Sequence, residues 1–193
     1  MSPRRLILLL IAVVTVGLVG AYVGLRLREP PAPPPSAIGG AFQMSDQNGR
    51  AVDADLLKDK WSLVFFGFTY CPDVCPTTLQ AMNAARQQLG GKAKDVQIVF
   101  VSVDPGRDDP EQMEAYLEGQ GLSGVVGLTG TPEQVETFAR NYKVFYRKVG
   151  EGEGYTVDHT TVAYLMDPKG RFVKPLAYGM SPEQMAGQIR QAM

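Results

Sequence analysis

Short apolar runs, separated by more polar segments, divide residues 41–193 into expected strands and helices. Residues 61–66 (WSLVFF) and 96–103 (VQIVFVSV) are nearly continuous apolar runs, which is typical of strands buried on both faces of a sheet. Asn48-Gly49 predicts the tight turn of an earlier hairpin. Further strands are expected at residues 42–44, 50–52, 125–128, 144–149, 161–166 and 172–176, the last two joined by a turn at 167–170 (DPKG).

Helices are expected between these strands. Residues 131–133 (TPE) and 181–183 (SPE) each place a capping hydroxyl before a proline and an acidic residue, which is a typical helix start. The expected helices span residues 75–89, 110–119 and 132–142, and a last helix begins at residue 182. Buried strands that alternate with helices and end in a hairpin and a helix predict an α/β, three-layer sandwich with an N-terminal hairpin.

The N-terminal segment has a different pattern. Residues 6–25 are 20 uncharged, mostly apolar residues, enough for a helix of about 30 Å that crosses a bilayer's hydrocarbon core. A cleaved secretory signal is the alternative, but this run exceeds the usual signal core and no A-x-A site follows. We therefore expect a tail at 1–5, a single transmembrane anchor at 6–25, a proline-rich linker at 26–40 and a globular domain at 41–193.

The flanks of the anchor bear on orientation. Two arginines precede the apolar run and two follow it, so charge alone decides little. A five-residue tail is easier to leave in the cytoplasm than a folded domain is to retain there. No Arg- and Ser-rich presequence precedes the anchor. We expect a single-pass protein of the bacterial inner (cytoplasmic) membrane, with its domain in the periplasm.

Charge excludes one class of partner. The chain has 19 basic and 20 acidic residues; four of the basic residues and one acid lie within residues 1–29, so the remainder carries −4. That remainder shows no basic stripe with interleaved aromatic residues, and nucleic-acid binding is not expected.

The candidate chemistry is concentrated in three residues. Cys71 and Cys75 are the only cysteines and His159 is the only histidine. Two sulfurs and one imidazole are a ligand set suited to copper. The cysteines follow a buried strand and stand where a helix begins, so the helix N-terminus favours thiolate over thiol. The C-x-x-x-C spacing permits either a disulfide or a joint grip on one metal ion.

Other interpretations of these residues stay open. The cysteines would suit a structural disulfide in an oxidising compartment, although so short a loop gains little stability. A lone histidine is commonly a surface residue, or a core residue whose ring nitrogens are hydrogen-bonded. Asp73 and Asp158 are placed to orient the imidazole or to tune the site from outside the ligand set, and are otherwise solvated loop acids. The methionines form no M-x-x-M cluster and are expected to fill the core.

Several segments, taken together and in order, resemble the Sco/SenC family. They are residues 66–76 (FGFTYCPDVCP), 103–108 (VDPGRD), 127–130 (GLTG), 157–159 (VDH) and 164–170 (YLMDPKG). The family comprises membrane-anchored copper chaperones with a thioredoxin-like fold. The resemblance implies that Cys71, Cys75 and His159 bind one copper ion, as Cu(I), Cu(II) or both. Thr160 stands where the family commonly has serine, a minor departure.

The resemblance also implies a function and partners. The expected function is delivery of copper to the CuA centre of cytochrome c oxidase. The partners would be the copper-receiving oxidase subunit, a copper donor and a periplasmic thiol reductant. The alternative is an enzyme, a thiol–disulfide oxidoreductase that reduces the receiving protein's cysteines; a peroxidase is a third option. The wide cysteine spacing, and the lack of a proline where disulfide-exchanging relatives carry one, favour the chaperone.

Overall fold

The structure is a computed structural model that describes residues 3–26, 38–122 and 124–193. The chain divides into two compact units, Met1–Pro35 and Ser36–Met193. The first contains helix α1 (Pro3–Arg26). Among the described residues, no helix combines the length and the apolarity needed to cross a membrane. The linker expected at residues 26–40 lies largely outside the described residues.

The second unit is built on a seven-stranded sheet with the order β2-β1-β5-β4-β3-β8-β9. Its centre is parallel: β3 (Trp61–Gly67) pairs with β4 (Val96–Ser102), and β4 pairs with β5 (Val125–Thr129). Antiparallel hairpins occupy both edges. They are β1 (Gln43–Asp46) with β2 (Ala51–Asp53), and β8 (Ala163–Met166) with β9 (Phe172–Leu176). The expected N-terminal hairpin and both buried strands are confirmed.

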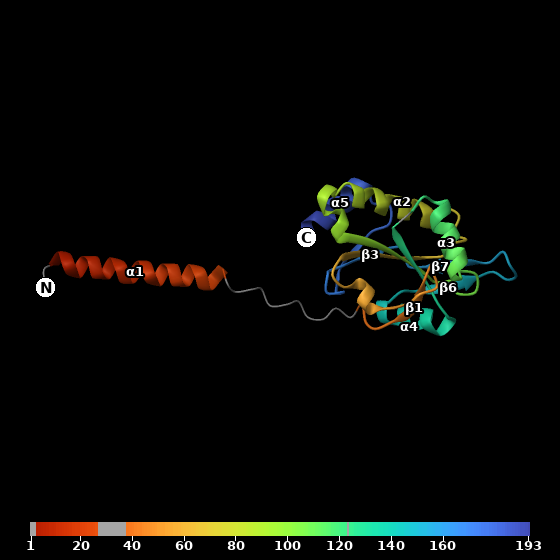
Figure 1. Ribbon diagram of the computed structural model, residues 1–193, viewed down its shortest axis with the longest axis horizontal. Helices are drawn as coiled ribbons and strands as arrows, with labels where there is room; N and C mark the ends of the chain where they lie inside the picture. The colour runs from red at the N-terminus through yellow and green to blue at the C-terminus, as the bar shows by residue number, and fades with distance from the viewer. Residues whose placement is uncertain (1–2, 27–37, 123) are drawn as a thin grey trace. The chain divides into compact units, whose positions relative to one another are not determined.

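Helices cover both faces of this sheet (Figure 1). Helices α2 (Val74–Gln87), α3 (Pro110–Gly119) and α5 (Pro182–Ala192) bury apolar residues in one core, and α4 (Pro132–Tyr142) buries them in the other. Both expected capping residues are confirmed, because Thr131 and Ser181 each accept the N–H of the glutamine three residues later. The three layers follow from strands whose side chains are buried on both faces.

The strand expected within residues 144–149 is present, but it lies outside the main sheet. It is β6 (Tyr146–Val149), which pairs only with β7 (Thr156–His159), in a separate two-stranded sheet. His159 therefore ends β7 and does not open β8, which begins at Ala163. The reason is the composition of β6, whose sequence YRKV presents Arg147 and Lys148 and is mostly exposed, so it cannot lie inside a sheet covered on both faces.

Candidate metal centre

The cysteine loop, which we define as residues 67–75, joins the end of β3 to the first turn of α2. Cys71 lies in the loop and is half-buried, whereas Cys75 lies within α2 and is fully buried. The Cys75 N–H donates to the Cys71 sulfur at 3.4 Å. The Cys71 sulfur thus accepts a hydrogen bond from an N–H of the first helical turn that has no partner within the helix. The Asp73 side chain, at the N-cap, makes no capping bond. The predicted position of the cysteines at a helix start is confirmed.

Gly67 makes room for this arrangement. A Cβ at this position would lie 2.5 Å from the Cys75 sulfur and 2.8 Å from the Phe100 ring. No side chain is compatible with such distances unless the sulfur moves. Glycine at the end of β3 is therefore needed for Cys75 to pack beneath the loop.

Both cysteines are free thiols, and their acidities differ. A hydrogen bond from Cys75 lowers the pKa of Cys71 to about 4, helped by backbone N–H groups, while burial opposes the shift. The pKa of Cys75 is raised, because it shares its proton with the Cys71 sulfur and because it is buried. The first proton to leave the pair therefore leaves Cys71, giving an accessible thiolate above a buried thiol.

His159 reaches the cysteines from the hairpin β6–β7. Its Nε2 lies 3.9 Å from the Cys75 sulfur, and its Nδ1 lies 3.0 Å from the Thr160 carbonyl oxygen. A carbonyl oxygen only accepts hydrogen bonds, so Nδ1 carries the proton and the Nε2 lone pair faces the sulfur. The ring also makes edge contacts with Phe65 and Phe68. The imidazole is thereby held in the tautomer and orientation that a metal ligand needs.

The side chains of Cys71, Cys75 and His159 suit a soft metal ion, and their site is open to solvent on one side. Cys71 and His159 line one groove of about 420 Å³. Among the described residues, no three His, Cys, Asp or Glu side chains form a group that would already hold a metal ion. Cys71 and His159 at the wall of this groove, with the Cys75 sulfur buried beside the imidazole, fit copper better than a hard cation such as Mg²⁺.

The two candidate acids make contacts elsewhere. Asp73 accepts a hydrogen bond from the Thr77 hydroxyl at 3.1 Å. Asp158 forms an exposed ion pair with Arg147 at 2.8 Å. Both line the groove, but the Nδ1 partner of His159 is a carbonyl oxygen and not a carboxylate.

A buried aspartate that sequence reasoning did not single out supports the cysteine loop. Asp108 is only 1% exposed and accepts hydrogen bonds from the Thr69 N–H, the Thr69 hydroxyl and the Ser102 hydroxyl. Burial raises the pKa of Asp108, and these hydrogen bonds oppose the rise. The available signal was its place in the polar run 104–109 (DPGRDD), directly after a buried strand. Loops at the carboxyl ends of neighbouring parallel strands lie side by side.

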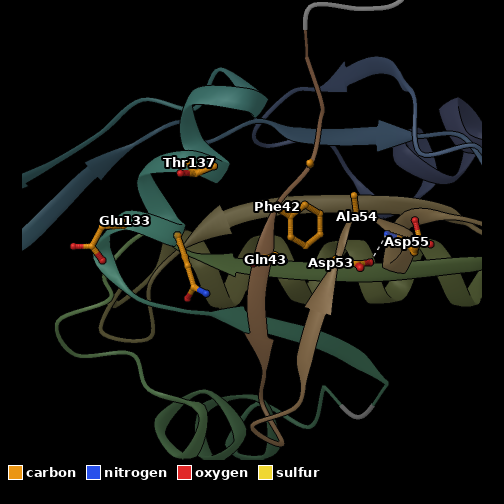
Figure 2. Close-up of a pocket in the computed structure, with 9 residues that line it drawn as sticks. Phe42, Gln43, Asp53, Ala54, Asp55, Glu133 and Thr137 are labelled. Atoms are coloured by element: carbon orange, nitrogen blue, oxygen red, sulfur yellow. Dashed lines mark hydrogen bonds between the residues drawn. The ribbon is translucent and has the colours of Figure 1, made fainter.

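A larger groove elsewhere carries no such chemistry. It measures about 580 Å³ and is lined by residues just before and at the start of β1, at the end of β2 and just after it, and in α4 (Figure 2). Its acids already have partners: Asp53 accepts the Asp55 N–H, Asp55 pairs with Lys58, and Glu133 accepts from the Thr131 hydroxyl. None of its lining residues is a cysteine or a histidine.

Known proteins resemble this chain over most of its length. A family model described as SCO1/SenC matches residues 30–193. The mitochondrial SCO1 homolog 1 of Arabidopsis thaliana is 40% identical over 152 residues, which are 78% of this chain and 45% of the relative. The chain thus spans about half the length of that relative.

Two solved structures extend the likeness to three dimensions. Bradyrhizobium japonicum ScoI with copper bound is 43% identical, with a TM-score of 0.74 over 81% of this chain and 99% of the other. BsSco, described as having a disulfide switch and as one of the Sco family of cytochrome c oxidase assembly proteins, is 28% identical, with a TM-score of 0.64 over 82% and 94%. These likenesses confirm the mixed α/β, thioredoxin-like fold that the sequence resemblance implies.

Proposed function

The chain belongs to the SCO1/SenC family, and from that premise we propose that it is a copper chaperone whose Cys71, Cys75 and His159 hold one copper ion. The observation that carries the proposal is the convergence of the chain's only imidazole on its only two sulfurs, with Nε2 turned 3.9 Å from the Cys75 sulfur. The copper-bound structure of a 43% identical relative supports the choice of metal.

The proposed ligands would have different roles in binding and releasing copper. Cys71 is half-buried at the groove and is the more acidic thiol, so it meets an incoming ion first. Cys75 is buried and must lose its proton for both sulfurs to bind. Binding therefore releases a proton, and copper affinity falls as pH falls. Release runs the other way: a ligand of the receiving protein enters the open groove and displaces Cys71.

We propose the CuA centre of a cytochrome c oxidase subunit as the recipient. Support comes from the family membership and from the description of the Sco family as cytochrome c oxidase assembly proteins. The test uses the full chain in detergent, reduced anaerobically and given one equivalent of Cu(II). Retention of one copper per chain, followed by its transfer to the copper-free oxidase subunit, is expected. A folded, fully reduced protein that retains no copper would overturn the proposal.

A second candidate function is thiol–disulfide exchange with the receiving protein's cysteines. The observation that favours it is the Cys71 thiol, which is free, accessible and has a pKa lowered to about 4. Copper-free reduced protein would then reduce a disulfide in the oxidase subunit. That activity should vanish in Cys71→Ser and survive in His159→Ala, whereas chaperone activity should vanish in both.

The proposed location is the bacterial inner membrane, with residues 6–25 as the anchor and the domain in the periplasm. Its support is the uncharged apolar sequence of these residues. After alkaline carbonate washing, the full chain should stay with the membranes, and added protease should degrade the domain in spheroplasts. Recovery of the chain in the wash would contradict the anchor.

A further inference from the structure

The histidine-bearing hairpin is weakly tied to the rest of the domain. Strands β6 and β7 pair only with each other, and an isolated two-stranded hairpin is marginally stable at best. Its apolar contacts with the domain come from buried Val157 and from partly buried Tyr146 and Tyr155. Such contacts are not directional. Holding His159 at one distance from Cys75 requires something more specific.

The directional contacts come from the loop between β4 and α3. The Arg107 guanidinium donates from Nη1 to the Tyr155 carbonyl at 3.0 Å and to the Glu153 carbonyl at 3.4 Å. The Tyr155 hydroxyl donates to Asp104 at 2.6 Å. Among residues 38–122 and 124–193, the side-chain hydrogen bonds between residues 146–159 and the rest of the domain are these, the Cys75–His159 contact and the bond from His159 to its neighbour Thr160.

Arg107 also touches the cysteine loop. Its guanidinium carbon lies 3.6 Å from the Tyr155 ring centroid, 4.6 Å from that of Tyr70 and 5.7 Å from that of Phe68. Phe68 and Tyr70 lie in the turn that leads to Cys71, whereas Tyr155 belongs to the hairpin. Arginine favours such contacts because its planar cation stacks on aromatic faces while its N–H groups donate. One side chain therefore contacts both halves of the site.

The environment of Arg107 argues against a merely space-filling role. Its side chain is only 15% exposed and forms a 2.6 Å ion pair with Asp104, which is 6% exposed. Its Nη2 is buried without a hydrogen-bond partner. Burying a cation with an unsatisfied N–H is unfavourable by itself. An apolar side chain would fill the same space without that cost, but it would make none of the bonds to the hairpin.

We propose that Arg107, fixed by Asp104, is a positioning residue that locks the hairpin β6–β7 against the cysteine loop and so sets the place of His159. The inference rests on the proposed function, because it assigns Arg107 a role through a proposed copper ligand. Without Arg107, the two sulfurs stay in place in the cysteine loop and α2, while the imidazole leaves its position.

The test compares Arg107→Ala and Arg107→Lys with Arg171→Ala in the full chain. Arg171 pairs with Asp167 at 2.6 Å in the turn between β8 and β9, so its variant removes an ion pair of the same length, though a more exposed one, away from the site. In metal-free protein, amide hydrogen exchange at residues 156–159 should speed up in both Arg107 variants and not in the control. Cu(II) affinity should fall by about 10–100-fold, the usual effect of losing a residue that orients a metal ligand.

A double variant separates positioning from general stability. If Arg107 acts through His159, then Arg107→Ala combined with His159→Ala should bind Cu(II) no more weakly than His159→Ala alone. Additive losses would overturn the inference, as would wild-type exchange and affinity in Arg107→Ala. Should Arg107→Ala fail to fold, Arg107→Lys and Tyr155→Phe supply the same comparison.

The two proposals fail in different ways. If His159→Ala binds copper like wild type, the ligand set fails, and amide exchange in the metal-free Arg107 variants still decides whether this residue holds the hairpin. If His159→Ala loses Cu(II) while the Arg107 variants keep it, only the positioning role fails.

Discussion

The two halves of the candidate site are built in different ways. The cysteine loop emerges from the buried centre of the sheet, and Cys75 itself belongs to the main core. The histidine half stands on a peripheral hairpin whose specific contacts come from residues about 50 positions away in sequence, 46 for Glu153 and 48 for Tyr155. The core of the domain thus holds the cysteine loop in place, whereas side-chain contacts hold the histidine-bearing hairpin against the domain. The difference predicts that substitutions elsewhere in the domain rarely move the two sulfurs from their positions in the fold, and that they move the imidazole easily.

The largest expected effect concerns Cys71. An ordinary cysteine has a pKa of about 8.5, so roughly one thiol in 300 is ionised at pH 6. The pKa of Cys71 is lowered to about 4, so its thiolate persists as pH falls and is lost only near pH 4. Alkylation by iodoacetamide, followed by mass spectrometry, should therefore stay fast at pH 5–6 in the folded protein.

Two controls sharpen this prediction. Denatured protein should show the ordinary pH profile. Cys75→Ala removes the hydrogen bond that contributes most to the shift and should move the profile toward higher pH. An alkylation rate for the folded wild type that rises only above pH 8 would contradict the assigned acidity.

The support of the cysteine loop gives the next largest effect. Asp108→Ala removes three hydrogen bonds to a buried carboxylate and should lower the free energy of unfolding by about 3 kcal/mol. Its neighbour Asp109 caps α3 by accepting the Gln112 N–H, and Asp109→Ala should cost only about 1 kcal/mol. Urea unfolding followed by circular dichroism measures both. Equal losses would mean that Asp108 has no special role beneath the loop.

The close packing of Cys75 against β3 predicts a further loss. Gly67→Ala places a methyl group 2.5 Å from the Cys75 sulfur, and such overpacking costs about 1–3 kcal/mol. Gly91→Ala is the control, because a Cβ there meets nothing within 4 Å. Thermal unfolding of the two variants should separate them. A Gly67→Ala protein as stable as the control would show that the sulfur moves freely.

The smallest effect is expected from an exposed ion pair on the hairpin. Arg147 and Asp158 pair at 2.8 Å with side chains that are 66% and 51% exposed. Arg147→Ala should change the free energy of unfolding by about 0–1 kcal/mol, less at high salt. The salt dependence of urea unfolding measures this change. A larger loss would mean that this pair, and not Arg107, holds the hairpin.

The same division explains what the sequence could predict. The strands β3 and β4 follow from continuous apolar runs, the starts of α4 and α5 from capping hydroxyls, and the place of the cysteines from the strand that precedes them. Strand β7, which carries His159, was not among the expected strands, because nothing local separates residues 156–159 from the strand that follows. Their pairing with β6 is a local hairpin around glycines 150, 152 and 154, and its docking depends on Arg107. Contacts of one arginine with distant carbonyls leave no periodic pattern in the sequence.

The central claim is that the only imidazole completes a copper site begun by two sulfurs. The most direct test records visible and electron paramagnetic resonance spectra of reduced wild type and His159→Ala, each with one equivalent of Cu(II). The account predicts a thiolate-to-copper charge-transfer band in wild type and its loss in the variant, with the unfolding midpoint and the dithiol oxidation rate unchanged. A variant that binds Cu(II) with the wild-type spectrum would contradict it.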